Sequence, residues 1–271
     1  HCHFTGKYRG AACDSCNKKI SNLQLPCLAH NYGGYDSGAI MRAIARMPGT
    51  ATPRVIHRSR EKQLCCTYEG LVFRDSLNIL SGSLAKLIAD ARKEGDLRRT
   101  FPLTYARHPY CGDDEDLDLL SRKLPMCYSS LNDPAVMDED YPIPAKAAFR
   151  DDMRDEPVDE EAWANLQRLR EKKDIHTIPR LHDAYLACDV LLLADIIENN
   201  RQAFKEVLGL DLLQCLTMPK ASWYGALYRT GAEIELVTEQ QLADDIEAGL
   251  RGGLSCPFQP MATANDPRTS T

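Results

Sequence analysis

Three residues of this 271-residue chain could take part in metal-dependent cleavage of a phosphodiester bond. Asp36 stands at the start of a predicted helix, and Tyr185 and Asp189 lie four residues apart within another. This spacing puts Tyr185 and Asp189 on one helix face. Two-metal hydrolysis needs clustered carboxylates and a group that orients the attacking water. Each feature alone has a simpler interpretation, because Asp36 could be a helix cap and a Tyr–Asp pair of this spacing is usually a surface pair.

Hydrophobic periodicity indicates which elements carry these residues. We expect strands over 25–30, 54–57, 64–68 and 71–73, a turn over 31–34, and helices over 37–47, 83–91, 179–208 and 239–250. Gly209 should end the longest helix. We expect an irregular insertion over 108–161, which is rich in proline, and a hairpin or short strands after Trp223. The order strand, helix, strands, helix predicts an α/β fold.

Charge is unevenly distributed along the chain. The net charge is -6, yet residues 1–62 carry a net +7 and residues 113–161 a net -11. A basic front and an acidic middle suit a protein that contacts a polyanion on one face, although charge runs are commonly just solvated surface. No apolar run is long enough to cross a bilayer and no signal peptide is evident. We therefore expect an intracellular protein with mostly reduced cysteines and no membrane contact.

Four stretches, taken in order, resemble motifs of protein-primed family B DNA polymerases. His30–Asp36 is similar to the second exonuclease motif, and Tyr185–Asp189 to the third. Between them, Asp75–Leu77 resembles a segment that contacts single-stranded DNA, and Leu250–Gly253 resembles the linker between exonuclease and polymerase domains. The resemblance is strongest to the polymerases of Polinton/Maverick elements and related eukaryotic viruses. The stretches that carry it are 3–12, 30–36, 74–87, 185–201 and 247–255.

This resemblance implies a ribonuclease-H-like 3′–5′ exonuclease domain over residues 23–208, a small Cys/His-rich module over 1–22 and a linker into the polymerase region over 209–271. It implies that Asp36 and Asp189 bind two catalytic Mg²⁺ or Mn²⁺ ions and that Tyr185 orients the water. The implied partners are DNA, as a single-stranded 3′ end and as template-primer, and a terminal protein that primes synthesis. The residues implied to contact nucleic acid are Asn31, Tyr35, Ser76, Leu77, Arg251, Gly252 and Gly253.

The front module has a resemblance of its own. His1-Cys2-His3 followed by Cys13-x-x-Cys16 is similar to the core of phage recombination endonucleases of the His-metal type. In those proteins two Cys-x-x-Cys pairs hold a structural zinc, and a tetrahedral Cys₄ site needs both pairs. Because only one pair is present here, Zn²⁺ binding at Cys13 and Cys16 and a reduced dithiol both stay open.

Two departures from the polymerase pattern bear on activity. The first exonuclease motif, Asp-x-Glu, would lie upstream of His1, and the polymerase carboxylates would lie downstream of Thr271. We therefore expect half of an exonuclease metal site and an inactive isolated chain. Two alternatives are a catalytically inactive DNA-binding remnant of a mobile element and a His–Cys endonuclease-like module.

Overall fold

The structure is a computed structural model that describes residues 24–48, 51–59, 62–122, 124–150, 156–235 and 237–250. The chain divides into two units, residues 1–230 and residues 231–271. The predicted module over 1–22, with Cys13 and Cys16, lies outside the described residues, as do Arg251, Gly252 and Gly253. No helix in the described ranges is long and apolar enough to cross a membrane.

A mixed four-stranded sheet lies in the first unit, with the strand order β1-β4-β3-β2. Its strands are β1 (Leu25–Ala29), β2 (Arg54–His57), β3 (Gln63–Tyr68) and β4 (Leu71–Asp75). Glu69 and Gly70 form the hairpin turn between β3 and β4, and both residues have positive φ, 45° and 83°, as the turns that match strand twist require. β1 pairs with β4 in parallel, with Ala29 opposite Asp75, so both strands end at the same edge of the sheet.

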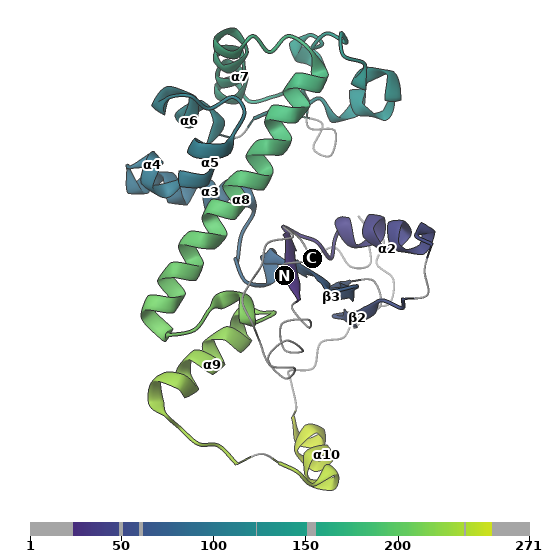
Figure 1. The fold of residues 1–271 in the computed structure, drawn as a ribbon, viewed down its shortest axis with the longest axis vertical. Coiled ribbons are helices and arrows are strands. Elements are labelled where there is room, and N and C mark those ends of the chain that lie inside the picture. The colour runs from purple at the N-terminus through teal and green to yellow at the C-terminus, as the bar shows by residue number, and fades with distance from the viewer. Residues whose placement is uncertain are drawn as a thin grey trace, which may run out of the picture. The chain divides into compact units, whose positions relative to one another are not determined.

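Helices make up most of the rest of the described chain, and they confirm an α/β fold (Figure 1). The helices are α2 (Asp36–Arg46), α3 (Leu84–Ala91), α4 (Leu97–Thr100), α5 (Pro102–Arg107), α6 (Asp114–Leu120), α7 (Glu160–Lys173), α8 (Ile178–Leu208), α9 (Met218–Thr230) and, in the second unit, α10 (Gln240–Gly249). Short 3₁₀ turns are η1 (Ser76–Asn78), η2 (Arg92–Glu94), η3 (Tyr128–Asn132), η4 (Pro134–Met137), η5 (Lys146–Ala148) and η6 (Leu212–Gln214).

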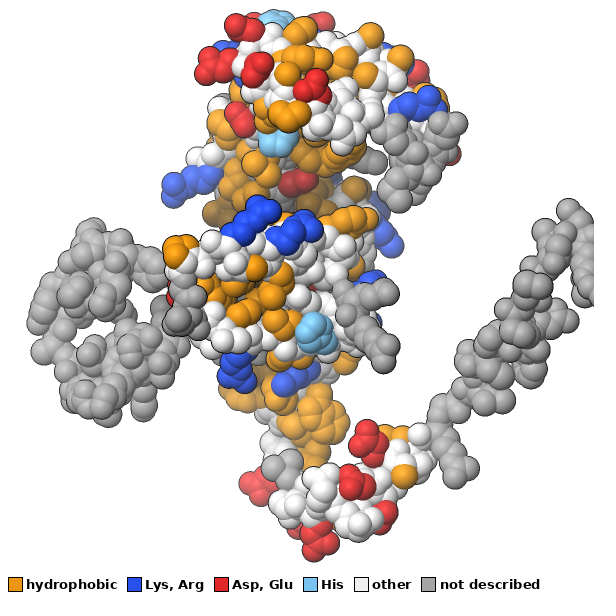
Figure 2. Space-filling view, turned by 90° about the vertical axis from the view of Figure 1, so that its right-hand side faces the viewer, with side chains coloured by type: hydrophobic (Ala, Val, Ile, Leu, Met, Phe, Trp, Pro, Cys, Tyr) orange, Lys and Arg blue, Asp and Glu red, His pale blue; other side chains and the backbone are white. Residues whose placement is uncertain are grey.

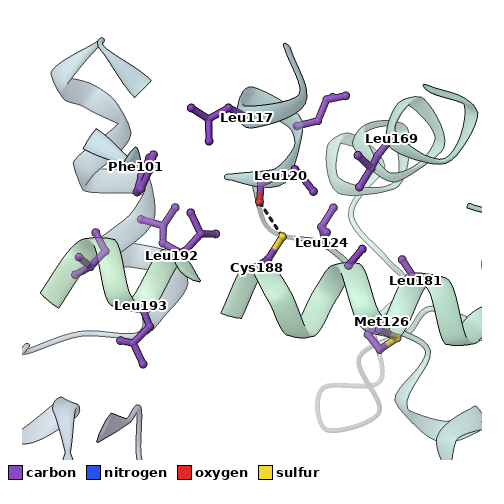
Figure 3. Close-up of a cluster of buried hydrophobic side chains, with 14 of the residues drawn as sticks. Phe101, Leu117, Leu120, Leu124, Met126, Leu169, Leu181, Cys188, Leu192 and Leu193 are labelled. Carbon is purple, nitrogen blue, oxygen red and sulfur yellow. Dashed lines mark hydrogen bonds between the residues drawn. The ribbon is translucent and has the colours of Figure 1, made fainter. Parts of the chain in front are cut away.

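The long helix α8 supplies the central row of the hydrophobic core. Leu181, Cys188, Leu192 and Ile196 are buried along one face, with the spacing expected of a helix that packs on one side. Around this row lie side chains from α6, α7 and the α4–α5 junction, including Leu117, Leu120, Leu169 and Phe101 (Figure 3). The helix ends at Gly209, as predicted, in a left-handed conformation with φ 72°.

A buried carboxylate ties α8 to α5. Asp195 is 1% exposed and accepts hydrogen bonds from the amides of Leu103 and Thr104, at 2.8 and 2.9 Å, and from the Thr104 hydroxyl at 2.7 Å. These donors occupy the first turn of α5, whose amides have no partner within the helix. Burial raises the pKa of Asp195, and the hydrogen bonds from Thr104 and Leu103 offset part of that rise.

The expectation of an irregular insertion over 108–161 is wrong in part. This segment contains α6 and three 3₁₀ turns, and it places Leu124, Met126 and Phe149 in the core. A capping box between Asp113 and Asp116 starts α6, and such reciprocal bonds satisfy orphan amides at a helix start. Part of the acidic excess, from Asp113 to Asp116, therefore belongs to a helix start whose side chains form ion pairs.

The strands expected after Trp223 are also wrong. Residues 218–230 form α9, which packs against the end of α8. Trp and Tyr favour strands as isolated residues, but tertiary packing overrides that preference. A Cβ on Gly225 would lie 2.6 Å from Leu208 Cδ1, so glycine permits the close approach of the two helices.

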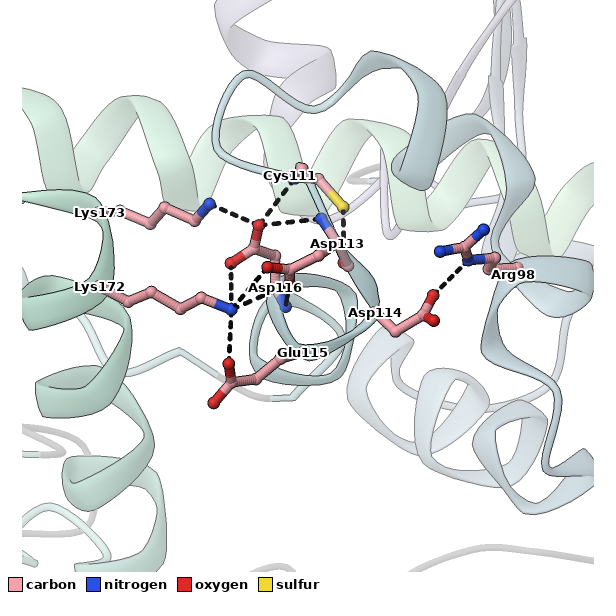
Figure 4. Close-up of polar contacts among 9 residues, drawn as sticks. Arg98, Cys111, Asp113, Asp114, Glu115, Asp116, Lys172 and Lys173 are labelled. Carbon is pink, nitrogen blue, oxygen red and sulfur yellow. Dashed lines mark hydrogen bonds and ion pairs between the residues drawn. The ribbon is translucent and has the colours of Figure 1, made fainter.

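Asp116 organises a cluster of charges between α6 and α7 (Figure 4). The residue is 0% exposed, and its carboxylate meets Lys172 Nζ at 3.1 Å and Lys173 Nζ at 2.5 Å. It also accepts hydrogen bonds from the Gly112 and Asp113 amides at 2.7 and 3.1 Å. Burial alone would raise the pKa of Asp116, but the hydrogen bonds from Lys173, Gly112 and Lys172 lower it to about 2.

This cluster predicts a specific loss of stability in acid. Because the pKa of Asp116 is lower in the folded than in the unfolded chain, its contribution is complete above about pH 4 and is lost as the pH falls through about 2. Asp116→Asn should lower the free energy of unfolding at pH 7 by about 1.5–3 kcal/mol, the range for hydrogen bonds to charged groups. Urea denaturation between pH 2 and 7 measures both effects.

The matched control is Asp114→Asn, which removes an ion pair between Asp114 and Arg98 whose side chains are 69% and 54% exposed. Exposed pairs contribute little, so this variant should follow the original chain across the pH range. An Asp116→Asn variant with the same stability and the same acid sensitivity as the original chain would contradict the assignment.

Candidate functional site

The loop between β1 and α2 is held in place by one buried carboxylate. Asp75, at the end of β4, is 7% exposed. Its Oδ1 accepts hydrogen bonds from the amides of Asn31 and Leu77, at 2.9 and 3.0 Å, and its Oδ2 accepts one from Gly33 at 3.1 Å. Asn31 adopts a left-handed conformation with φ 66°. One side chain therefore joins two stretches that are more than forty residues apart.

His30 and Ser76 form a second link between the same stretches. His30 Nδ1 lies 3.0 Å from Ser76 Oγ, and Nε2 lies 2.9 Å from the Gly82 carbonyl oxygen. Since a carbonyl can only accept, Nε2 donates to Gly82, and the Ser76 hydroxyl lies within hydrogen-bond distance of both Nδ1 and the Ala29 carbonyl oxygen, to which it donates at 3.3 Å. Ser76 is 1% exposed, so its hydroxyl is engaged inside the protein, whereas the side chain of Leu77 is 37% exposed.

The loop buries one tyrosine and exposes another. Tyr32 is fully buried, stacks on Phe73 with ring centroids 6.5 Å apart and donates a hydrogen bond to Gln63 Oε1 at 3.0 Å. Tyr35, three residues later, is 74% exposed. Asp36 is also exposed and is the first residue of α2, where its charge complements the helix dipole. The loop therefore exposes to solvent an aromatic ring and a carboxylate that are adjacent in sequence.

Tyr185 and Asp189 form the second group of predicted residues. The Tyr185 hydroxyl lies 2.8 Å from the hydroxyl of Tyr128 in η3, and Asp189 follows one helical turn later in α8. Burial raises the pKa of Tyr185, and the bond to Tyr128 and the Asp189 charge raise it further. Burial also raises the pKa of Asp189, while the bond from Tyr185 offsets part of that rise. Tyr185 is therefore held in its neutral form by burial, with the Tyr128 hydroxyl as its hydrogen-bond partner.

A cysteine–histidine contact lies behind this pair but does not form a nucleophilic site. Cys188 Sγ is 3.4 Å from His108 Nε2, and both residues are buried. Burial raises the pKa of Cys188 and lowers that of His108, so the neutral forms of both are favoured. A nucleophilic cysteine needs the thiolate. The contact is therefore part of the core, with the thiol donating to the Leu120 carbonyl.

The structure joins the predicted residues into two groups, one around Asp75 and one around Tyr185. Asp36 contributes to the electrostatic surroundings of Tyr32, and Asp189 to those of Tyr185 and Cys188. Within the part of the chain that the structure describes, no three His, Cys, Asp or Glu side chains lie together so that they could hold a metal ion.

Sequence reasoning missed the structural roles of Asp75, His30 and Tyr128. The role of Asp75 follows from the parallel pairing of β1 with β4. This pairing places Asp75 opposite Ala29 and thus beside the loop that follows β1. No sequence signal marks Tyr128, which reaches Tyr185 from a 3₁₀ turn 57 positions away.

Comparison of the chain with protein-family models, with curated proteins and with solved structures found no match.

Removing the Asp75 carboxylate should release the loop. Asp75→Ala leaves the amides of Asn31, Gly33 and Leu77 without their acceptor, and each donor that stays buried and unpaired costs roughly 1–3 kcal/mol. We expect a lower free energy of unfolding in urea and faster hydrogen exchange at these three amides. Asp75→Asn, which keeps one acceptor oxygen, should show a smaller change.

Asp36→Ala serves as the control because Asp36 is exposed and its side chain does not cap α2. It should leave exchange at the three amides unchanged. Protected amides in Asp75→Ala would show that the carboxylate does not hold the loop.

Proposed function

We propose that this chain belongs to the 3′–5′ exonuclease and DNA-binding region of a protein-primed family B DNA polymerase, and that residues 23–208 form a ribonuclease-H-like domain. The observation that supports the proposal is the link between His30–Asp36 and Asp75–Leu77. Both stretches resemble segments that hold DNA in that family, and Asp75 and His30 bring them together. An α/β sheet with parallel β1 and β4 is compatible with the proposed fold.

The exposed groups of the loop suit a single strand of DNA. Tyr35 presents an aromatic ring on which a base can stack, and such stacking is tolerant of sequence. The exposed side of Leu77 offers apolar contact, and Asn31 holds the loop conformation through its left-handed backbone. Figure 2 shows Lys and Arg side chains around the middle of the viewed face and Asp and Glu at its upper end. A polyanion would be attracted to the first region and repelled by the second.

The proposed cofactors are Mg²⁺ or Mn²⁺, which prefer hard oxygen ligands such as carboxylates. Asp36 and Asp189 would each supply such a ligand in the intact enzyme, and a bound cation would lower the pKa of Asp189 that burial raises. The described residues do not bring three metal ligands together. In the intact polymerase the proposed partners are template-primer DNA and a terminal protein primer.

Single-strand binding tests the role of the loop. Tyr35→Ala should weaken binding of a short oligothymidine by about 1–3 kcal/mol, the range for one stacked base. Because Tyr35 is 74% exposed, its removal should change stability by less than about 0.5 kcal/mol. Fluorescence anisotropy at low salt and thermal denaturation measure the two quantities.

Tyr32→Ala is the contrasting variant, since Tyr32 is fully buried. It should cost about 3–5 kcal/mol of stability, as large aromatic truncations in a core do. Unchanged oligothymidine affinity in a stable Tyr35→Ala protein would refute the proposed stacking.

The carboxylates predict no nuclease activity from this chain alone. With Mg²⁺ or Mn²⁺ it should release no nucleotides from a labelled single-stranded 3′ end, because a two-metal site needs more clustered ligands than the described residues provide. In a longer protein that carries the first exonuclease motif and the polymerase motifs, Asp36→Ala or Asp189→Ala should abolish proofreading and leave polymerisation intact. Asp189-dependent release by the chain alone would contradict the first expectation.

The inactive DNA-binding remnant is the second candidate, because the exposed Tyr35 ring would serve single-strand binding without any catalytic site. It predicts oligothymidine binding that depends on Tyr35, with no proofreading even in the longer protein. The longer-protein assay therefore separates the two candidates.

A further inference from the structure

Helix α9 carries an exposed row of aromatic side chains. Trp223, Tyr224 and Tyr228 are 55%, 44% and 66% exposed. Lys220, Tyr224 and Tyr228 are spaced by four residues and so lie along one line of the helix, with Trp223 beside it. Side chains of this size are usually buried when a core has room for them, so an exposed row of three indicates a binding surface.

The neighbouring face of α9, whose edge is formed by Tyr228, packs against the end of α8. Ala221 is fully buried, and Gly225 allows close contact with Leu208 at the end of α8. The ring of Tyr228 lies over Gly209, where a Cβ would come within 2.5 Å of it. The aromatic row therefore sits on a helix that is already ordered, and a ligand would not have to order it on binding.

The charge of α9 favours a polyanion. The helix contains Lys220 and Arg229 and no acidic residue. Lys220 Nζ lies 5.3 Å from the centre of the Tyr224 ring, so a cation and an aromatic face are presented together. Aromatic rings that stack bases, combined with cations that contact phosphates, are the chemistry of single-strand binding. These charges disfavour a second copy of this chain as the partner, because two α9 helices facing each other would bring like positive charges together.

From these features we propose that the row formed by Lys220, Trp223, Tyr224 and Tyr228 binds single-stranded nucleic acid. This surface differs from the loop around Tyr35. Arg74, next to Asp75 in β4, donates a hydrogen bond to the Leu213 carbonyl in η6, shortly before α9 begins. That bond ties the strand that holds the loop to the segment that leads into α9, so both surfaces belong to one unit.

Tryptophan fluorescence tests the proposal directly, because the chain has only two tryptophans. Trp163 packs edge-on against Phe149, with ring centroids 5.2 Å apart, and Trp163→Phe leaves Trp223 as the single reporter. Adding oligothymidine at low salt should quench its emission in a saturable way. Lys220→Ala in the same background should reduce the slope of log affinity against log salt by about 0.7, the value for one phosphate on a single strand.

Anisotropy with a labelled oligothymidine provides an independent measure that does not rely on Trp163→Phe. Trp223→Ala should lower the affinity about 5- to 150-fold, the effect of losing one stacked base, and Trp223→Phe should retain most of it. Tyr141→Ala, which removes a partly exposed aromatic from another segment, is the control and should bind like the original chain.

The Tyr35→Ala variant separates this inference from the proposed function. If Trp223 quenching persists in Tyr35→Ala while affinity falls, both surfaces contribute. If Tyr35→Ala has no effect and Trp223 is quenched, the α9 surface stands and the loop role fails. Absence of saturable quenching together with unchanged affinity in Trp223→Ala overturns the α9 proposal. Self-association that Trp223→Ala abolishes and oligothymidine does not affect would overturn it as well, because α9 would then bind a second copy.

Discussion

The carboxylate of Asp75 is the group on which the arrangement of the candidate site depends. It stands at the end of β4 and receives three amides from two loops. Since β4 runs parallel to β1, the chain that leaves β1 passes directly over it. The left-handed backbone of Asn31, the burial of Tyr32 and the exposure of Tyr35 are parts of the same loop conformation. A neutral side chain of similar size would supply fewer acceptor sites to the same three amides.

The helix α8 is the second element that the structure depends on, because it serves two purposes along its length. One face is the centre of the core, with Leu181 and Leu192 fully or almost fully buried. The Tyr185–Asp189 pair lies at the margin of that face, where burial is enough to raise the pKa of Asp189 without removing it from solvent. The position of these two residues is therefore fixed by packing of the core next to them, and Tyr128 adds a hydroxyl from outside the helix.

Two aromatic surfaces in one unit suggest a common way of holding a flexible strand. The loop offers Tyr35 and the helix α9 offers Trp223, Tyr224 and Tyr228, all on backbone that is tied down on its other side. Rigid rings lose little conformational entropy on binding. Such a protein could hold a strand at separate points without reading its sequence, since every base has a face that stacks. The net charge of -6 is compatible with this, because contacts are decided by local charge within a screening length of about 10 Å.

The sequence by itself determined the local elements up to α3, the long helix and its end at Gly209, because hydrophobic periodicity and turn residues act over a few positions. It did not determine α9, where strands were expected and where the burial of Ala221 and the close approach of Gly225 to Leu208 favour a helix. It also did not predict the helix α6 within 108–161, because the prolines of this segment indicated a loop. In the structure, Leu117 and Leu120 of α6 are part of the core. The link from Asp75 to Asn31 and the contact of Tyr128 with Tyr185 were decided by tertiary structure alone. Each joins residues more than forty positions apart, and such pairings depend on strand order and helix packing, which short-range patterns do not specify.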